Sequence, residues 1–144
     1  MIYLDSCALV KLVVTEKETP ALLEYLEGRR AEMVSSELAL AEVVRVVRRS
    51  CFDGQRRLAV KPEVRDERMR AAASLLDRID LVVVNSATFL HAAAYDGDPL
   101  LGSPDAIHLA AAQAIGKELA AFITYDNRLA QAAKDCGLPL ARPA

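Results

Sequence analysis

The spacing of apolar residues along the chain predicts alternating strands and helices. Short apolar runs are typical of buried strands, whereas apolar residues every three or four positions indicate amphipathic helices. The clearest run is Leu-Val-Val-Val at residues 81–84, which we expect to form a buried strand. The expected strands are residues 1–4, 32–34, 80–84, 121–124 and 138–140. The expected helices are residues 6–14, 21–30, 36–49, 63–78, 86–95, 103–116 and 127–136.

Helix ends are predicted from their capping residues. Ser6, Ser103 and either Ser35 or Ser36 are of the residue type that caps helix N-termini. Pro104 suits the first turn that follows such a cap. Strands that alternate with helices indicate an α/β fold with a twisted parallel sheet of four to five strands, covered by helices on both faces. Residues 1–144 are long enough for one domain, and we expect a single one.

Composition adds a constraint on the core and on the compartment. Hydrophobic residues make up 53% of the chain and aromatic residues only 5%, so Ala, Val and Leu must fill the core. Three cysteines without a C-x₂-C pair indicate neither a zinc site nor a disulfide framework. We find no signal segment and no apolar stretch of membrane-spanning length. A cytoplasmic protein without membrane contact is therefore expected.

The charge is unevenly distributed. The net charge is −2, but residues 45–70 carry nine basic against four acidic residues, a local excess of +5. A basic segment in an otherwise acidic chain suits a nucleic-acid phosphate backbone. A pair of charged, solvated helices explains the same feature equally well.

Three acidic residues fall where ligands bind in parallel α/β sheets, beyond the carboxyl ends of strands. Asp5 follows the first strand, and Asp126 follows the strand that ends at Thr124. Asp105 lies in the first turn of the helix opened by Ser103. The alternative for Asp105 is purely structural, because a negative charge at a helix N-terminus contributes about 0.3–1 kcal/mol.

A fourth acid, Glu42, lies at the rim of an apolar helix face. Its alternative is an ion pair with Arg45, worth about 0.2–0.5 kcal/mol on a helix surface. If the four acids converge, which depends on the fold, a cation must offset their repulsion, because two like charges 4 Å apart repel by roughly 4 kcal/mol. An all-oxygen site with the hydroxyls of Ser6 and Thr124 nearby suits Mg²⁺, or Mn²⁺.

Four segments in order along the chain resemble the PIN-domain family, and within it the VapC toxins of type II toxin–antitoxin systems. The opening MIYLDSCALVKL resembles the first strand with its catalytic aspartate, and the run from Ser36 to Arg45 resembles the segment with the family's glutamate. SPDAIHLA at residues 103–110 resembles the stretch with the third acid, and TYDNRL at 124–129 resembles the final T-x-D-x-x-L. Cys7 is a departure, because many relatives carry a small hydroxyl or apolar residue there.

The resemblance implies a metal-dependent endoribonuclease. It implies that Asp5 and Asp105 hold the principal metal, that Asp126 completes this site or a second one, and that Glu42 binds metal or orients water. A bound cation acidifies water, so no Ser, His or Cys nucleophile is required. Arg45 and Arg49 are expected to hold the RNA backbone. The resemblance also implies an RNA substrate, a homodimer and neutralisation by a cognate VapB-like antitoxin in a hetero-oligomer.

Three other functions are compared with this one. A catalytically silent PIN-fold domain that binds RNA or a partner would be marked by a missing acid, and none is missing. A phospho-receiver domain needs an acceptor Asp after its third strand, where this chain has Asn85. A dinucleotide or P-loop site lacks its glycine signature. His108, one turn after Asp105, is expected to be a packed helix residue rather than part of the site.

Overall fold

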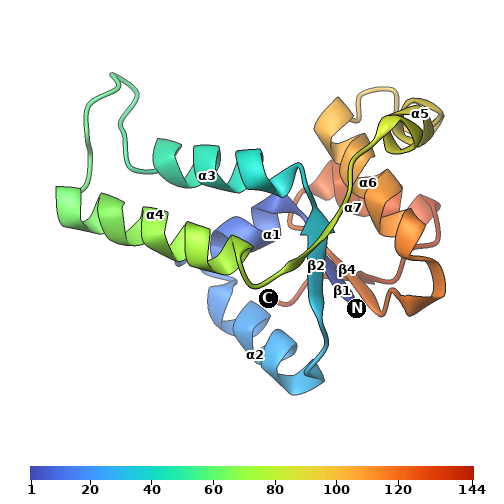
Figure 1. Cartoon of the computed structure of the whole chain (residues 1–144), viewed down its shortest axis with the longest axis horizontal. Helices are drawn as coiled ribbons and strands as arrows, with labels where there is room; N and C mark the ends of the chain where they lie inside the picture. Colours follow the sequence, from blue (N-terminus) through green and yellow to red (C-terminus); the bar gives the residue numbers. More distant parts are fainter.

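A computed structural model, which describes residues 1–144, has a five-stranded parallel sheet at its centre (Figure 1). The strand order is β3-β2-β1-β4-β5, and every neighbouring pair is parallel. From β1, the chain builds the sheet first toward β3 and later toward β5, so the topology reverses between β1 and β4. Ligands in such sheets bind at this reversal, beyond the carboxyl ends of the strands. The strands are β1 (Ile2–Leu4), β2 (Met33–Ser36), β3 (Asp80–Val82), β4 (Ala121–Ile123) and β5 (Leu140–Ala141).

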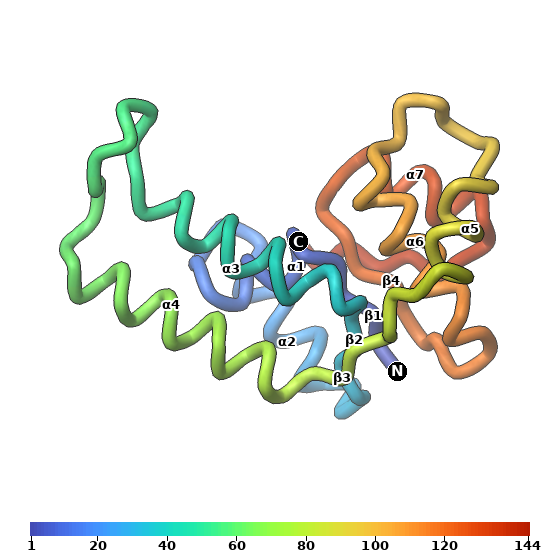
Figure 2. The backbone as a smooth tube through the Cα atoms, turned by 45° about the horizontal axis from the view of Figure 1, so that its top comes forward, coloured from blue at the N-terminus to red at the C-terminus, as the bar shows by residue number.

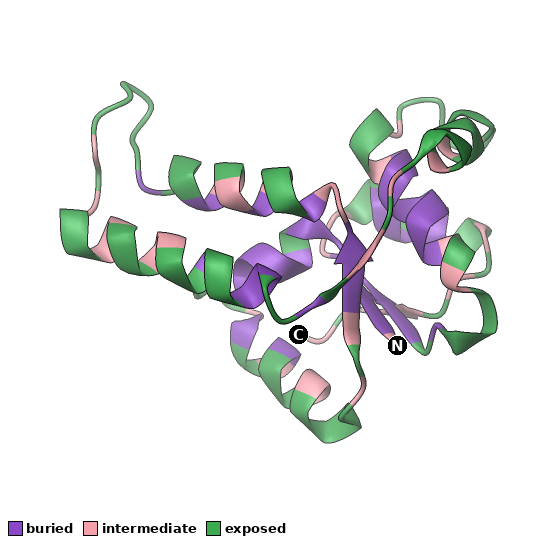
Figure 3. Cartoon of the chain, viewed as in Figure 1, coloured by how far each residue is buried: buried purple, intermediate pink, exposed green.

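Helices cover both faces of the sheet, as the sequence predicts. Alternate residues of β1 point to opposite faces: Ile2 and Leu4 belong to a core with α1–α4, and Tyr3 belongs to a second core with α6 and α7. Figure 3 shows the buried residues concentrated on the sheet and on the inner helix faces. The helices are α1 (Ser6–Lys11), α2 (Thr19–Arg29), α3 (Ala39–Arg49), α4 (Pro62–Leu76), α5 (Ser86–Ala93), α6 (Ser103–Ile115) and α7 (Asn127–Asp135), with a 3₁₀ turn η1 (Gly116–Glu118) after α6.

The predicted serine caps are wrong. Ser35 and Ser36 lie within β2 and are fully buried, and the Ser35 hydroxyl donates to the carbonyl of Leu4 at 2.7 Å. Helix α3 therefore begins only at Ala39, without a side-chain cap. Asp5 rather than Ser6 caps α1, and Gly102 rather than Ser103 precedes α6. The predicted caps lie one to three residues from the observed cap positions. For Ser35 and Ser36 the reason is that a polar residue in a buried strand looks like a turn in the sequence.

The apolar run at residues 81–84 is less buried than predicted. Strand β3 ends at Val82 and lies at the edge of the sheet, paired only with β2. Val83 follows it with 58% of its surface exposed. An edge strand needs fewer buried side chains than a central one, and hydrophobicity alone does not distinguish the two.

Helices α3 and α4 form an antiparallel hairpin that projects away from the sheet (Figures 1 and 2). The connection between them, at the tip, includes a bridge between Phe52 and Leu58. This hairpin carries the basic segment at residues 45–70. No helix in the structure combines the length and apolar character needed to cross a bilayer.

Candidate active site

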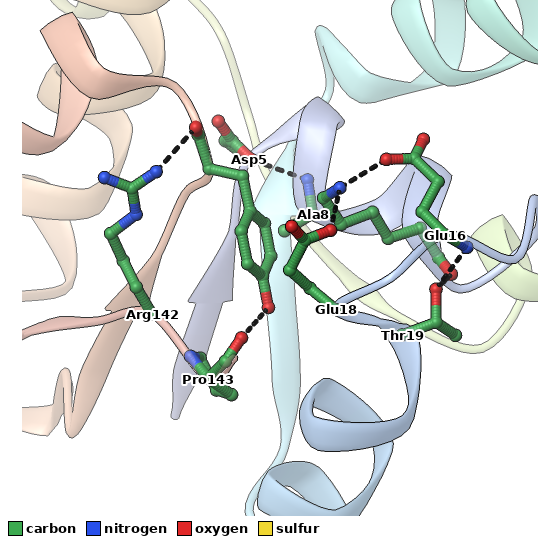
Figure 4. Close-up of polar contacts among 9 residues, drawn as sticks. Asp5, Ala8, Glu16, Glu18, Thr19, Arg142 and Pro143 are labelled. Carbon is green, nitrogen blue, oxygen red and sulfur yellow. Dashed lines mark hydrogen bonds and ion pairs between the residues drawn. The ribbon is translucent and has the colours of Figure 1, made fainter.

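Asp5 stands where β1 passes into α1, at the point where the sheet topology reverses. Its side chain is 2% exposed, and Oδ1 accepts the N–H of Ala8 at 2.8 Å, which caps α1 (Figure 4). Oδ2 accepts the hydroxyl of Thr124 at 2.5 Å. The pairing of Leu4 with Ile123 in the sheet brings these two residues side by side. The carboxylate is thus held from both β1 and β4.

The environment of Asp5 disfavours its negative charge. Burial raises the pKa of the carboxyl to about 6, and the nearby charge of Asp105 acts in the same direction. The hydrogen bonds from Thr124 and Ala8, and the nearby His108, lower the pKa only in part. No basic side chain forms an ion pair with Asp5, so burial of its ionised form is poorly compensated within the protein.

Asp105 lies in the first turn of α6 and is half-buried. Its carboxylate accepts no hydrogen bond from the protein, and no basic side chain forms an ion pair with it. Burial raises its pKa, and the charge of Asp126 raises it further. A carboxylate whose only task was to stabilise the helix N-terminus would be expected to have its charge favoured. The raised pKa therefore counts against the purely structural alternative.

Glu42, in the first turn of α3, is bound by two side chains from other elements. Its Oε2 accepts the hydroxyl of Ser6 at 2.5 Å and lies 2.8 Å from Nε2 of His108. Burial would raise the pKa of Glu42, but the hydrogen bonds from His108 and Ser6 outweigh it and hold the pKa below its usual value. Glu42 forms no ion pair with Arg45, so that alternative was wrong. The position of Glu42 on its own helix face could not reveal a partner on α6.

Asp126 has a more external place than the other three acids. It caps α7, and its Oδ1 accepts the N–H groups of Arg128 and Leu129, each at 2.8 Å. The Thr124 hydroxyl, besides donating to Asp5, accepts the N–H of Asp126 at 3.1 Å. Asp126 therefore interacts with Asp105 through its charge, and it is linked to Asp5 by the Thr124 hydroxyl.

Three of the predicted acids share one cleft: Asp5, Glu42 and Asp105. Arg45 and Arg49 line the same cleft, as do Ser6, Cys7 and His108. Asp126 does not line it. The Cys7 thiol lies near all four acids. Burial and the negative charges of the acids together raise its pKa to about 12; the acids are Asp5, Asp126, Asp105 and Glu42.

The residues of the cleft fit an open divalent-cation site. The donors are carboxylate and hydroxyl oxygens, and Asp105 has no partner within the protein. The structure contains no group of three or more Asp, Glu, His or Cys side chains placed to hold a metal ion together, so protein ligands would supply only part of the coordination. Mg²⁺ commonly binds through one or two carboxylates, retains several waters and also contacts substrate phosphate. An open arrangement of this kind therefore suits it.

His108 belongs to the site, contrary to the prediction from the sequence. It is 2% exposed, which agrees with a packed residue, but its ring also contacts Glu42, Ser6 and Tyr3. The available signal was its position three residues after Asp105, which places both on one helix face. Tyr3 gave a weaker signal, because it precedes Asp5 by two positions and is therefore expected on the same side of the extended chain.

A basic surface continues from the cleft along the hairpin. Arg45 and Arg49 also line a second hollow with Arg48, Arg56 and Phe52. None of these arginines forms an ion pair within the chain. Their charges are therefore available to an anionic ligand.

Comparisons with known proteins agree with this geometry. The family described as the PIN domain matches residues 2–135. Over 146 aligned residues, the chain is 39% identical to Ribonuclease VapC35 of Mycobacterium tuberculosis (strain H37Rv), covering 99% of this chain and 97% of that protein. It is 40% identical to Ribonuclease VapC46 of the same strain, covering 99% and 98%.

A solved structure shows the same fold. The crystal structure of Mycobacterium tuberculosis VapC20, described as a sarcin-ricin loop cleaving toxin, superposes with a TM-score of 0.69 at 15% identity, covering 99% of this chain and 100% of that one. At this identity the likeness concerns the fold alone. The family match and the full-length relatives together establish that the chain belongs to the PIN-domain family, among the VapC ribonucleases.

Proposed function

We propose that this protein is a divalent-metal-dependent endoribonuclease, the toxin of a VapBC-type toxin–antitoxin pair. The observation that carries the proposal is the cleft in which Asp5, Glu42 and Asp105 lie beside Arg45 and Arg49. Acids that repel one another suit a cation, and arginines beside them suit a phosphodiester. The full-length likeness to proteins named ribonucleases supports the same reaction.

The roles of the acids follow from their surroundings. Asp5 and Asp105 hold a Mg²⁺ ion, for which Mn²⁺ is a plausible substitute, and Asp126 completes the site. Such an ion supplies acidification of water and stabilisation of negative charge on the phosphodiester. The hydrogen bonds of Thr124 and Ala8 fix the orientation of Asp5. Ser6 and His108 hold Glu42, which binds metal or orients water.

The substrate and partners follow from the charge pattern and from the family. Arg45 and Arg49 hold the RNA backbone on the hairpin side of the cleft. A VapB-like antitoxin neutralises the enzyme in a hetero-oligomer, and the toxin forms a homodimer. The chain acts as a single domain, in the cytoplasm, where structured and single-stranded RNA is available and its three unpaired cysteines remain reduced.

The test is an RNA cleavage assay with the purified full-length protein. Total RNA and ribosomal RNA are incubated with Mg²⁺, with Mn²⁺ and with EDTA, and the new ends are mapped. We expect discrete cuts with either metal and none in EDTA, with activity restored by added metal. Cleavage that persists in EDTA would contradict the metal dependence. RNA binding without cleavage under every metal condition would favour a catalytically silent PIN-fold domain.

A further inference from the structure

A buried polar chain runs from the central strand to Glu42. The Tyr3 hydroxyl lies 2.7 Å from Nδ1 of His108, and Nε2 of the same ring lies 2.8 Å from Oε2 of Glu42. Tyr3 and His108 are 0% and 2% exposed. We call these two residues the Tyr3–His108 arm. It connects β1 and α6 to α3, three elements that are distant in the sequence.

The hydrogen-bonding groups of the arm match in only one direction. An ionised Glu42 can only accept, so the proton that joins it to His108 must be on Nε2. In the neutral ring the other nitrogen, Nδ1, is then an acceptor and requires a donor. The Tyr3 phenol, 2.7 Å away, keeps its proton at neutral pH and supplies that donor. Tyr3 is a closer partner of Nδ1 than the Ser36 hydroxyl, which lies at 3.4 Å, and it therefore stabilises the tautomer of His108 that donates to Glu42.

Packing fixes the position of the arm. The Tyr3 ring stacks on Phe122, with centroids 5.3 Å apart and planes inclined by 11°. It also meets the His108 ring edge-on at 5.9 Å. No buried side-chain nitrogen or oxygen in the protein is left without a partner. The His108 ring packs against Tyr3 and is hydrogen-bonded at both nitrogens, so it cannot reorient without losing hydrogen bonds.

The arm leaves one oxygen of Glu42 free. Oε2 accepts both His108 and Ser6, whereas Oε1 has no hydrogen-bond partner within the protein. Glu42 also lines the cleft with Asp5 and Asp105. We propose that the Tyr3–His108 arm is a positioning device, which binds one oxygen of Glu42 from behind and presents the other to the cation in the cleft. The role assigned to the cation rests on the function proposed above.

The first measurement reads the tautomer directly, without any activity. The chain contains only two histidines, so ¹⁵N-histidine NMR of the full-length, metal-free protein gives two ring systems, and a His91→Gln variant assigns them. We expect His108 to carry its proton on Nε2 in the wild type. In Tyr3→Phe, where only the more distant Ser36 hydroxyl can reach Nδ1, we expect the Nδ1 resonance to move toward that of an acceptor nitrogen without a hydrogen bond. An unchanged Nδ1 resonance in the folded variant would show that Tyr3 does not hold the ring. A proton on Nδ1 in the wild type would overturn the proposal, even if Tyr3→Phe failed to fold.

The second measurement tests whether Tyr3 acts through Glu42. Mn²⁺ dissociation constants are measured by EPR for the wild type, Tyr3→Phe, Glu42→Gln and the double variant. Loss of a group that orients a ligand typically costs 10–100-fold in metal affinity, and for Tyr3→Phe we expect about 10-fold weaker binding. In the Glu42→Gln background, the same change should alter binding by no more than about 2-fold. Equal weakening in both backgrounds would overturn the proposal.

A matched control removes the same group elsewhere. The Tyr125 hydroxyl donates to the carbonyl of Pro143 at 2.8 Å and makes no hydrogen bond with Glu42 or with the Tyr3–His108 arm. Tyr125→Phe should leave the Mn²⁺ dissociation constant within about 2-fold of wild type. If the wild-type protein neither binds Mn²⁺ nor cleaves RNA, the proposed function fails. The NMR result then still decides whether the arm holds Glu42.

Discussion

Asp5 illustrates how one residue serves both the fold and the candidate site. It caps α1 through Ala8 and joins β1 to β4 through Thr124, yet burial raises its pKa to about 6. The folded protein therefore binds the Asp5 proton more tightly than the unfolded chain does, whose pKa is near 3.8. Stability from this group is present below pH 3.8 and is lost as the pH rises through about 6.

This linkage predicts a pH-dependent effect of Asp5→Asn. In EDTA, the wild type should lose about 2 kcal/mol of unfolding free energy relative to the variant between pH 4 and about 6.5, because a shift of one pKa unit corresponds to about 1.4 kcal/mol and part of the titration lies outside this range. Urea unfolding of both proteins across this range measures the difference. A difference that stays constant with pH would show that Asp5 titrates normally in the fold.

Asp105 gives the opposite combination, a carboxylate without a structural partner. Because its pKa is raised by burial and by Asp126, neutralising it should remove unfavourable desolvation and charge repulsion from the metal-free protein. We expect Asp105→Asn to raise the melting temperature in EDTA at pH 7.5 by a few degrees. The comparison is made by calorimetry. A clear decrease would instead support a helix-stabilising role for the charge at the start of α6.

At this scale, the sequence was most informative where a residue type coincided with a strand end. Asp5 and Asp126 could be located in this way, because parallel strands end at a common edge. Glu42 and His108 could not be paired from the sequence, since 66 residues separate them and only the packing of α3 near α6 brings them together. A residue's partner across two helices is a tertiary property.

Among the elements, the α3–α4 hairpin is the one that extends the candidate site. It projects from the sheet (Figure 2). Its Arg45 and Arg49 line both the cleft and a second hollow that Phe52 also lines. The local excess of positive charge could be read from the sequence, but its placement beside the acids could not. For edge strand β3, the apolar run in the sequence predicted more burial than the structure shows, because β3 has only one neighbouring strand.

The hairpin predicts a salt-dependent role in RNA binding. Arg45→Ala combined with Arg49→Ala should weaken binding to single-stranded RNA and reduce the slope of log K against log salt by about 1.4, or 0.7 for each lost phosphate contact. Fluorescence anisotropy between 50 and 300 mM salt, in EDTA, gives both quantities. As a control, Arg29→Ala alters an arginine on α2 that stacks on Tyr25 and should leave the slope unchanged. An unchanged slope in the double variant would remove the hairpin from the RNA interface.

For the whole molecule, the parallel sheet with helices on both faces follows from the alternation of strands and helices, which the sequence shows clearly. The strand order β3-β2-β1-β4-β5 does not, because nothing local fixes which strands are neighbours. That order places the ends of β1 and β4 together and so assembles acids that are about 120 residues apart. Fold class was therefore predictable from pattern, whereas convergence of the acids required the resemblance to a known family.

Cation binding should stabilise the entire domain. A ligand that binds only the folded state at 100 times its dissociation constant adds about 2.7 kcal/mol, which corresponds to roughly 10 °C for a chain of this size. Differential scanning fluorimetry with increasing Mn²⁺ should show this rise for the wild type and a much smaller one for Asp105→Asn. Equal shifts in the two proteins would place the cation elsewhere.

The central claim is that acids gathered at the end of the sheet bind the cation that permits RNA cleavage. The most direct measurement is the single-turnover cleavage rate of Asp105→Asn in Mg²⁺, on an RNA that the wild type cuts. The Asp105 carboxylate makes no hydrogen bond in the protein, so the variant should fold normally. Any loss of activity then reflects the loss of this carboxylate from the cleft. We expect a rate at least roughly 100-fold below wild type. A folded variant that cleaves at the wild-type rate would contradict the account.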